Sequence, residues 1–495
     1  MKKTYNNPLC TILPQRVVMG IMGFLAIAVS YTIRQSLSVT ITEMVPKKTD
    51  ARIGETYSWS ETEQGWVLSS FYIGYVISHV PGGLVAEKFG AKWTIGCGVL
   101  LMGVLNALTP IAVRYGNIMV VIVLRIIMGL GGGTTYPALS VMLAAWVPEK
   151  ERGKLGSIVF GGGQIGSLVS FALSSVILGK YHWQYNFYCW SIISVIWFIL
   201  FTITCYSDPA SHPFITQKEL NYLNAELGQT KRNDKLPPTP WSSILTNIPV
   251  MAMVFAQMGH DWILYVISSD LPKYLKEVLH VPTEEVGFYT SLPFLGMWLF
   301  SIFSGYVSDF LIVRRILTIT QARKFFTFLG AVPPAFFIMA ASYAEKNLFV
   351  VVTMFVCAMS FLGNFYPGLK INSLDLSPNY SGSLMALTNG IGGISGVVVP
   401  PFIGYIVDDK TNSAILQWRK VFWITFGFSI VRTVVFLLWG SGVVQQFNNP
   451  VKQLSVESGI SRQPDTPTNR YEMSSDLSDQ TIDKNVVVFN EQNKT

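Results

Sequence analysis

Twelve long apolar stretches restrict what this chain can fold into more than any other feature of the sequence. The first, Val17 to Thr42, holds a single charged residue, Arg34. Roughly 20 apolar residues in a helix cross the ~30 Å core of a bilayer, where only helices or closed barrels satisfy their backbone polar groups. The stretches are too uniformly apolar for barrel strands. We therefore predict transmembrane helices at about 17–42, 63–87, 93–113, 118–147, 153–179, 185–206, 247–277, 285–309, 323–344, 348–376, 381–407 and 419–443.

Composition agrees with an integral, multi-pass membrane protein. The chain is 50% hydrophobic and 13% charged, whereas a soluble domain carries about 25% charged residues. The net charge of +7 comes from short turns between the apolar stretches, as is typical of a cytosolic membrane face. We therefore expect both termini to be cytosolic, with membrane lipid and no nucleic acid as a partner.

The two halves of the sequence repeat each other. Two short patterns of Gly, Leu, Tyr and Pro each occur twice, 230 and 229 residues apart. Transporters with parallel repeats bind substrate near the middle of the membrane, between the repeats. The matched sets are Gly133, Tyr136, Pro137 and Leu139 with Gly363, Tyr366, Pro367 and Leu369, and Gly153, Leu155, Gly161 and Gly163 with Gly382, Leu384, Gly390 and Gly392.

We predict an all-α membrane protein with twelve transmembrane helices in two pseudo-symmetric six-helix bundles. Between the bundles, Thr216 and Glu219 match the capping box of a short amphipathic helix. The expected parts are a cytosolic N-terminal segment (1–16), an N-terminal bundle (17–206), a cytosolic central loop (207–246), a C-terminal bundle (247–444) and a disordered cytosolic tail (445–495).

The stretch from Gly83 to Lys92 resembles the cytoplasmic-loop signature of the major facilitator superfamily, with Glu87 in place of the usual Asp. From about Val17 to Gln445 the chain is similar to the anion:cation symporters (solute carrier family 17), which include sialin, the vesicular glutamate transporters and the sodium–phosphate cotransporters. Sialin and insect-type phosphate carriers are the nearest fits. The resemblance implies the major facilitator fold. It rests on SYTIRQSLSV (30–39), GWVLSSFYIGYVISHVPGGLVAEKFGAK (65–92), LRIIMGLGGGTTYPA (124–138), WVPEKERGKLGS (146–157), SLPFLGMWL (291–299) and INSLDLSP (371–378).

Two arginines within the apolar stretches are the main candidates for substrate binding. An ionised side chain in the bilayer core costs about 3 kcal/mol or more, so Arg34 and Arg125 each need a partner or a function. Two guanidiniums at one depth make a bidentate site for a carboxylate or phosphate. Alternatively, each pairs with a local acid or extends toward the surface. The resemblance implies that both lie in the substrate pathway.

Three further residues complete the predicted substrate site. Lys370 either binds the anion or extends toward the cytosolic surface, and relatives more often have Asn or Ser there. His260, which can titrate near neutral pH, lies near the middle of its span beside Asp261. We assign His260 to substrate binding and Asp261 to coupling; otherwise the two simply hydrogen-bond each other or a neighbouring helix. Tyr136 lines the cavity or, with Pro137, shapes a kink.

Acidic residues at the inner ends of the predicted helices are candidates for gating. Glu87, Asp309 and Asp375 can form inter-helix gates with Arg152 or Arg314, or else they are solvated helix ends. We therefore also assign Arg152 to gating.

The coupling ion stays open between H⁺ and Na⁺, with membrane potential as a third driving force. The resemblance implies two glutamates in the fourth span, but Met128 and Gly132 occupy those positions, and Leu68 replaces the histidine of the glutamate carriers. Proton coupling by the route used in sialin is therefore in doubt.

No pattern in the sequence indicates an enzyme, and we predict no catalytic residues, no metal ligands and no cofactor. The five cysteines lack metal-binding spacing. The stretch from Gly161 to Gly166 matches G-x-G-x-x-G, but it lies inside an apolar span rather than after a strand. We interpret its glycines as small residues for close helix packing.

We expect a secondary active transporter that moves small organic or inorganic anions by alternating access, with the anion held by membrane-embedded arginines. The alternatives are a Na⁺-dependent inorganic phosphate cotransporter and, more remotely, an anion channel or a transporter-like receptor. We expect a monomer whose partners are a small anionic substrate and lipid. The N-terminal segment has no acidic dileucine signal, which favours the plasma membrane over lysosomal or vesicular membranes.

Overall fold

The computed structural model is almost entirely helical and describes residues 14–45, 56–148, 155–156, 158–230, 239–344, 347–408 and 413–448. Eleven helices in these ranges are long and apolar enough to cross a membrane. The helix α2 (Glu61–Phe89), 29 residues long, is the twelfth; its serines, tyrosines and His79 lower its hydropathy. The predicted fold class is confirmed. The boundaries of the central loop with the two bundles, at 206 and 247, stay a prediction. Most of the predicted terminal segments 1–16 and 445–495 lies outside the described residues.

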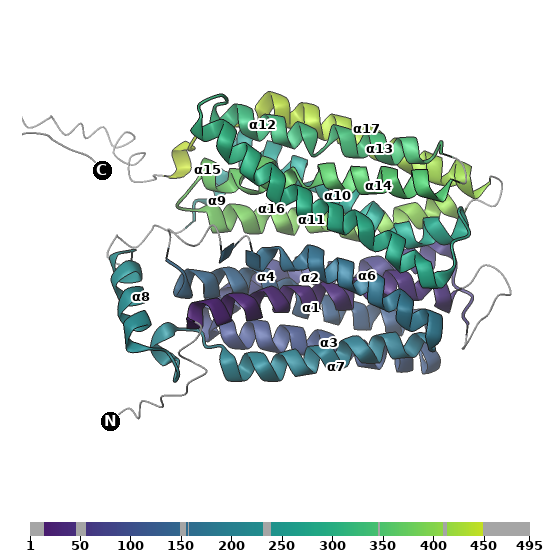
Figure 1. Ribbon diagram of the computed structural model, residues 1–495, viewed down its shortest axis with the longest axis horizontal. Helices are drawn as coiled ribbons and strands as arrows, with labels where there is room; N and C mark the ends of the chain where they lie inside the picture. The colour runs from purple at the N-terminus through teal and green to yellow at the C-terminus, as the bar shows by residue number, and fades with distance from the viewer. Residues whose placement is uncertain are drawn as a thin grey trace, which may run out of the picture. The chain divides into compact units, whose positions relative to one another are not determined.

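The helices form two groups, α1–α7 on one side and α10–α17 on the other (Figure 1). Apart from two breaks within predicted spans and from α6, which begins at Gly162 although the span was predicted from 153, their bounds lie within a few residues of the predicted ones. The first group contains α1 (Gln15–Met44), α2, α3 (Ala91–Tyr115), α4 (Ile118–Trp146), α6 (Gly162–Lys180) and α7 (Trp183–Thr204). The second contains α10 (Ile248–Glu277), α11 (Thr283–Val313), α12 (Ile319–Leu329), α13 (Val332–Ala341), α14 (Leu348–Leu362), the π-helix η3 (Tyr366–Lys370), α15 (Asn372–Leu376), α16 (Ser381–Val407) and α17 (Ala414–Trp439). Short elements are η2 (Pro209–Ser211), α8 (Gln217–Thr230), α9 (Trp241–Leu245) and η4 (Gln446–Asn448).

Polar side chains determine where several helices begin. Ser60 and Glu63 form a capping box at the start of α2, so the side chain of each residue satisfies a backbone N–H of the other. In the central loop, the Glu219 backbone N–H donates to the Thr216 hydroxyl at 3.3 Å, which is one of the two bonds of the predicted capping box. The Glu219 carboxylate also accepts from the backbone N–H of Gln15 at 2.9 Å. The central-loop helix α8 therefore caps the N-terminus of α1.

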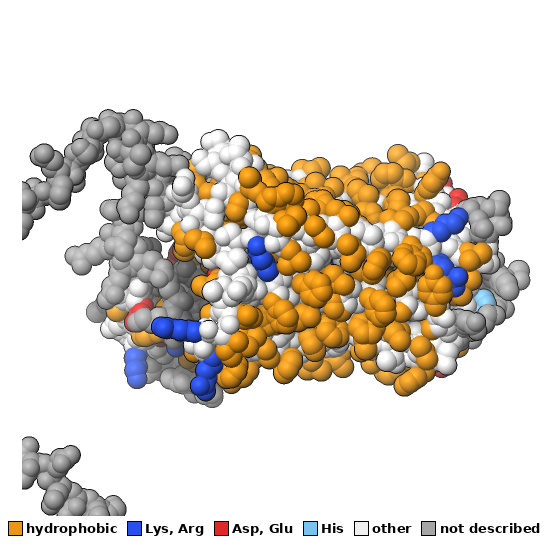
Figure 2. Space-filling view, turned by 90° about the horizontal axis from the view of Figure 1, so that it is seen from above, with side chains coloured by type: hydrophobic (Ala, Val, Ile, Leu, Met, Phe, Trp, Pro, Cys, Tyr) orange, Lys and Arg blue, Asp and Glu red, His pale blue; other side chains and the backbone are white. Residues whose placement is uncertain are grey.

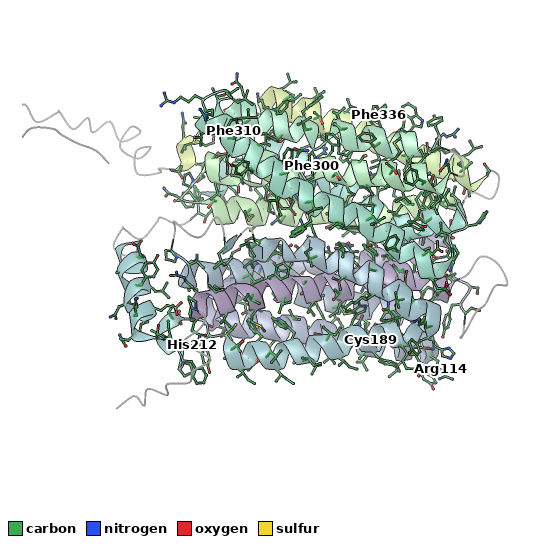
Figure 3. The ribbon with its side chains drawn as sticks, viewed as in Figure 1. Arg114, Cys189, His212, Phe300, Phe310 and Phe336 are labelled. Atoms are coloured by element: carbon green, nitrogen blue, oxygen red, sulfur yellow. The ribbon has the colours of Figure 1, made fainter. Side chains whose placement is uncertain are left out.

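The surface of the helices fits a lipid environment. Hydrophobic side chains cover the middle of the face in Figure 2, while most Lys and Arg side chains gather toward its two ends. On α11 and α13, Phe310 and Phe336 are about half exposed, and Figure 3 shows them with Arg114 at the end of α3. In lipid such apolar exposure carries no penalty, whereas in water it would mark an interaction site.

The predicted ninth span is broken into α12 and α13 at Gly330 and Ala331. Pro334 has no N–H to donate to the Gly330 carbonyl four residues earlier. The Arg432 guanidinium from α17 donates to that carbonyl at 3.0 Å, and to the Ala256 carbonyl of α10 at 2.9 Å. Arg432 is an intramembrane charge that the sequence analysis overlooked, and its role here is structural.

The two helix groups pack tightly near the ends at which α1 and α10 finish. A Cβ added to Gly65 of α2 would lie 2.5 Å from the Pro400 carbonyl oxygen of α16, and one added to Gly287 of α11 would lie 2.0 Å from the Phe171 carbonyl oxygen of α6. Nearer the other end of α16, a Cβ on Gly390 would meet no atom within 4 Å. Gly390 therefore does not contribute to the close packing of α16.

Ion pairs join the two groups at the tight end. The buried Lys273 ammonium of α10 lies 3.3 Å from the Glu61 carboxylate of α2. One turn on, Lys276 pairs with Glu43 of α1, which also accepts from the Thr283 hydroxyl. Removing one partner of a buried pair leaves a charge without compensation, typically at a cost of about 3–5 kcal/mol. These pairs therefore stabilise the closed form of this end.

We expect the Lys273→Glu variant to open this end, because two carboxylates would then face each other across the interface. Spin labels on cysteines introduced by Ser58→Cys and Glu285→Cys, in a chain whose five native cysteines are replaced by serine, report the separation. Double electron–electron resonance should show a longer distance in the variant. Adding Glu61→Lys should restore the original distance, whereas Lys218→Glu on α8 should change nothing. An unchanged distance in Lys273→Glu would refute the closing role.

Candidate substrate-binding site

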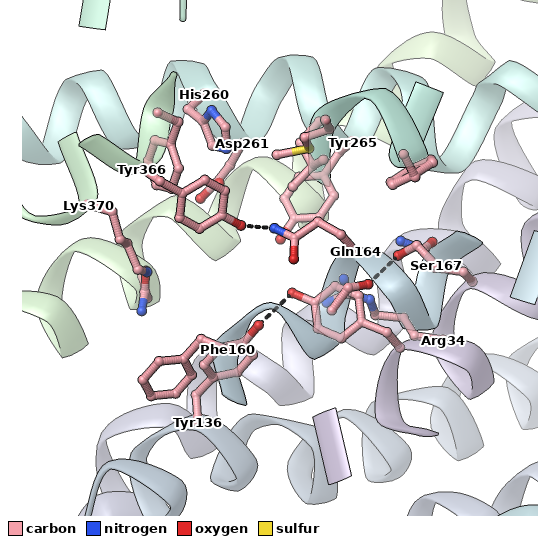
Figure 4. A pocket seen from close by; sticks show the side chains of 18 of the residues that line it. Arg34, Tyr136, Phe160, Gln164, Ser167, His260, Asp261, Tyr265, Tyr366 and Lys370 are labelled. Atoms are coloured by element: carbon pink, nitrogen blue, oxygen red, sulfur yellow. Dashed lines mark hydrogen bonds between the residues drawn. The ribbon is translucent and has the colours of Figure 1, made fainter. Parts of the chain in front are cut away.

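A cavity of about 850 Å³, including its opening, lies between the two helix groups (Figure 4). Its lining comes from α1, α2, α4, α6, α10, α11, η3 and α16, so both halves of the chain contribute. The polar lining consists of Arg34, Gln35, Gln164, Ser167, Gln257, His260, Asp261, Lys370 and Asn389, and the aromatic lining of Tyr31, Tyr75, Tyr136, Phe160, Tyr265, Phe294, Phe365 and Tyr366.

Arg34 enters the cavity from α1 and is 7% exposed. Its guanidinium carbon lies 3.9 Å from the centre of the Tyr31 ring and 5.3 Å from that of Tyr72. Such contacts attract a cation, but they are weaker than pairing with an anion. In the part of the chain that the structure describes, no carboxylate pairs with Arg34, and its buried Nε has no hydrogen-bond acceptor. Within the described ranges, Arg34 is therefore a buried cation with which no carboxylate pairs directly.

Arg125 lies behind Arg34 rather than in the cavity wall. It is 2% exposed, and its guanidinium carbon is 5.3 Å from the centre of the Phe71 ring. The Arg34 guanidinium is 6.0 Å from the same ring. The two arginines thus share one aromatic neighbour, as their common depth predicts. Contact between Arg125 and substrate stays a prediction, because only Arg34 lines the cavity in this conformation.

Lys370 provides a second cation, from the other half of the chain. Its ammonium donates to the Asn389 side-chain oxygen of α16 at 2.7 Å. The side chain therefore points into the cavity and does not extend toward the cytosolic surface, which was the alternative reading of the sequence. Figure 4 shows Lys370 and Arg34 on opposite sides of the cavity.

His260 and Asp261 both line the cavity, but the structure shows no hydrogen bond between them. The His260 ring stacks on Phe365, with ring centres 3.7 Å apart. The Asp261 carboxylate accepts from the Gln257 amide at 3.1 and 3.0 Å. The lining thus carries two cations, Arg34 and Lys370, against one carboxylate, which gives 2 − 1 = +1 with histidine neutral. An anion would neutralise this excess charge.

Two tyrosines at matching positions of the repeats face the cavity. The Tyr136 hydroxyl donates to that of Tyr31 at 3.1 Å, and its ring stacks on Phe160. The Tyr366 hydroxyl accepts from the Gln164 amide of α6, so this bond crosses between the two halves (Figure 4). The sequence analysis matched Tyr366 to Tyr136 but assigned a substrate role only to Tyr136. The repeat was the signal that pointed to both.

Among the predicted gating residues, Asp375 is the one that the structure shows in an ion pair between helices. Asp375 pairs with Arg323 of α12, at 2.5 Å between Oδ2 and Nε, and not with Arg314. The reason is position: α12 packs directly against η3, which leads into α15. Arg314 lies in the exposed turn after α11, with its guanidinium near Phe310. Asp309 is exposed and pairs with no described cation. Arg152 and the side chain of Glu87 lie outside the described residues.

The glycine-rich stretch in α6 has two roles. Cβ atoms added to Gly162 and Gly166 would lie 2.4 Å from the carbonyl oxygens of Phe24 and Ala28 on α1, so the predicted close helix packing is confirmed. Gln164, between these glycines, reaches the cavity and was missed. A polar side chain inside an apolar span is a signal that would have found it. Among the described residues no group of three His, Cys, Asp or Glu side chains is arranged to hold a metal ion.

Several transporters are similar in sequence to this chain over nearly its whole length. The sequence model of the Major Facilitator Superfamily matches residues 21–400 and 253–471. A "Putative inorganic phosphate cotransporter" of Drosophila melanogaster is 34% identical over 460 residues, 88% of this chain and 86% of that protein. Human sialin is 33% identical over 453 residues, 87% and 90% of the two chains. Vesicular glutamate transporter 3 of Danio rerio is 30% identical over 463 residues, 91% and 77%.

Solved transporter structures share the fold. A D-xylose–proton symporter superposes with a TM-score of 0.66 at 15% identity, covering 87% of this chain and 99% of that one. The nucleoside transporter NupG gives a TM-score of 0.58 at 16% identity, covering 86% and 99%. The chain therefore belongs to the major facilitator superfamily, in the branch that contains sialin and the vesicular glutamate transporters, and it is a membrane transporter and not an enzyme.

Proposed function

We propose that the protein is a secondary active transporter of small organic anions, which bind between Arg34 and Lys370. The observation that carries this proposal is the buried guanidinium of Arg34, which faces a cavity and has no carboxylate partner among the described residues. A buried cation without an anion is costly, and a bound carboxylate supplies the missing charge. Lys370 faces the same cavity from the other half, so one anion would contact both moving parts.

The aromatic lining of the cavity favours an organic anion over inorganic phosphate. The tyrosine and phenylalanine rings provide apolar contact that inorganic phosphate would leave unused. Na⁺-dependent phosphate cotransport is the second candidate, because it is what the name of the Drosophila melanogaster relative describes.

Asp261 is the carboxylate that we propose for coupling. It lies in the cavity wall, and its observed hydrogen bonds come from the uncharged Gln257 amide. A carboxylate beside a cationic anion site can bind H⁺ or Na⁺ when the anion enters, which links the two fluxes. This proposal does not need acidic groups at Met128 and Gly132, where the resemblance led us to expect them.

The Arg34→Ala variant should lower uptake at least ~100-fold, because two charge-assisted hydrogen bonds of about 1.5–3 kcal/mol each are lost. Arg34→Lys should keep a small part of the activity, since an ammonium cannot bind a carboxylate in bidentate fashion. Uptake into proteoliposomes is the measurement, with glutamate, sialate, urate and phosphate as probes. Arg114→Ala, at the end of α3, is the matched arginine control. Normal uptake by Arg34→Ala would refute the proposed site.

Asp261→Asn should abolish concentrative uptake but preserve exchange of labelled for unlabelled substrate, because the amide keeps the shape of the side chain and cannot bind a cation. Gly392→Ala should act in the same way, since the added Cβ would lie 2.1 Å from the Asp261 Oδ2 atom. Gly390→Ala on the same helix should behave like wild type, because its Cβ would meet nothing within 4 Å. Full concentrative uptake by Asp261→Asn would assign coupling elsewhere.

Separate H⁺, Na⁺ and voltage gradients in the same assay distinguish the alternatives. Replacing Na⁺ with choline at constant pH should leave uptake intact if H⁺ is coupled and stop it in a Na⁺-dependent phosphate cotransporter. A channel would give currents far above stoichiometric flux, and a receptor would bind ligand without flux. Either result would contradict the transporter proposal. Microscopy of the tagged protein tests the expected plasma-membrane location.

A further inference from the structure

The cavity residues Tyr366 and Lys370 lie at the two ends of a single π-helical turn, η3. The backbone N–H of Ile371 donates to the Tyr366 carbonyl five residues earlier, at 3.3 Å. In a regular α-helix this N–H would donate to the Pro367 carbonyl instead. Isolated π turns are frequent at functional sites because they redirect neighbouring side chains. Here the turn determines how two cavity residues are presented.

Arg323 of α12 is attached to this turn at two points. Its Nη1 donates to the Pro367 carbonyl at 2.8 Å. Its Nε and Nη2 donate to the Asp375 carboxylate, just beyond the turn, at 2.5 and 3.3 Å. Arg323 is 6% exposed, so these bonds form away from bulk water, where charge-assisted hydrogen bonds are strong. One guanidinium thus joins both ends of the segment that carries Lys370.

The backbones of α12 and the π turn are also in close contact. A Cβ added to Gly368 would lie 2.6 Å from the backbone nitrogen of Thr327 and 2.8 Å from its hydroxyl oxygen. Gly368 therefore allows the turn to rest directly on α12. This contact and the three hydrogen bonds of Arg323 leave the turn little freedom to move relative to α12.

We propose that Arg323 is a positioning residue for substrate binding. It does not line the cavity; it holds the π turn so that the Tyr366 hydroxyl and the Lys370 ammonium face the cavity. This inference rests on the proposed function, in which Lys370 contacts the anion. Arg323 is therefore more than one half of a helix–helix ion pair, because the bond to the Pro367 carbonyl acts on the backbone that carries both cavity residues.

Arg323→Lys tests this role. Lysine keeps the charge opposite Asp375 but lacks the planar fork that reaches a carboxylate and a carbonyl together. The variant should raise the KM for uptake ~10-fold and leave the maximal rate within about twofold of wild type. The kinetic probe is whichever of glutamate, sialate, urate and inorganic phosphate the wild-type protein takes up fastest. Arg314→Lys, in the exposed turn after α11, is the matched control and should change neither constant.

Hydrogen–deuterium exchange of the full-length protein tests the same inference without any substrate. Exchange in residues 364–376 should be faster in Arg323→Lys than in wild type. Residues 134–146, the repeat equivalent in α4, should be unchanged and serve as an internal control. Unchanged exchange in residues 364–376 would overturn the inference. Faster exchange with an unchanged KM would also overturn it, since the hydrogen bonds of Arg323 would then stabilise the turn without affecting substrate binding.

The double variant Arg323→Asp with Asp375→Arg separates positioning from simple ion pairing. The swap restores opposite charges but removes the donor that α12 presents to the Pro367 carbonyl. We expect the KM to stay raised; a KM restored to the wild-type value would show that the ion pair alone suffices. Lys370→Ala distinguishes the two proposals. An unchanged KM in this variant would refute the proposed contact between Lys370 and the substrate. The exchange experiment would still test whether Arg323 holds the π turn.

Discussion

The hydrocarbon core of a bilayer offers no water to a backbone carbonyl or N–H, and much of this structure follows from that constraint. Two helices of the second half are interrupted at prolines. In each case an arginine donates to a backbone carbonyl that lacks its usual helical hydrogen bond. Arg432 donates to Gly330 where α12 ends, and Arg323 donates to Pro367 within the π turn. The irregular backbone is thus buried in protein. It can shape a cavity because side chains from neighbouring helices donate hydrogen bonds to its unpaired carbonyls.

The same constraint separates structural charges from functional ones. Arg432 donates to two backbone carbonyls, and Lys273 pairs with Glu61 across the two helix groups. Both cations are compensated within the protein. Arg34 is also buried, but among the described residues it lies against aromatic rings and pairs with no carboxylate, and it faces the cavity. A buried cation without an anion requires a ligand of opposite charge. The lack of a carboxylate partner does not identify the binding residue by itself, because Arg125 is also buried beside an aromatic ring. Only Arg34 lines the cavity as well, and it is therefore the residue that we expect to bind substrate.

Periodic and compositional features of the sequence predicted most of the fold and part of the site. Apolar length located the membrane helices, and the repeat placed Tyr136 and Tyr366 at equivalent positions, where both now face one cavity. Charged residues within apolar spans drew attention to Arg34 and Lys370, but Arg432 was overlooked despite the same signal. The sequence did not point to Arg323 as a partner of Asp375, because helices distant in sequence become neighbours only after packing. Gln164 was hidden in a stretch of glycines that we interpreted as packing residues alone.

The sequence by itself determined that this chain spans a membrane as two repeated sets of helices, because the cost of exposing backbone groups to lipid leaves a long apolar segment no other regular structure. It also determined which buried charges need an explanation. Only the tertiary structure decided which of those charges are compensated and which face the cavity. Pairing depends on distances of 3 Å or so between helices far apart in sequence, and such distances follow from helix packing and not from the order of residues.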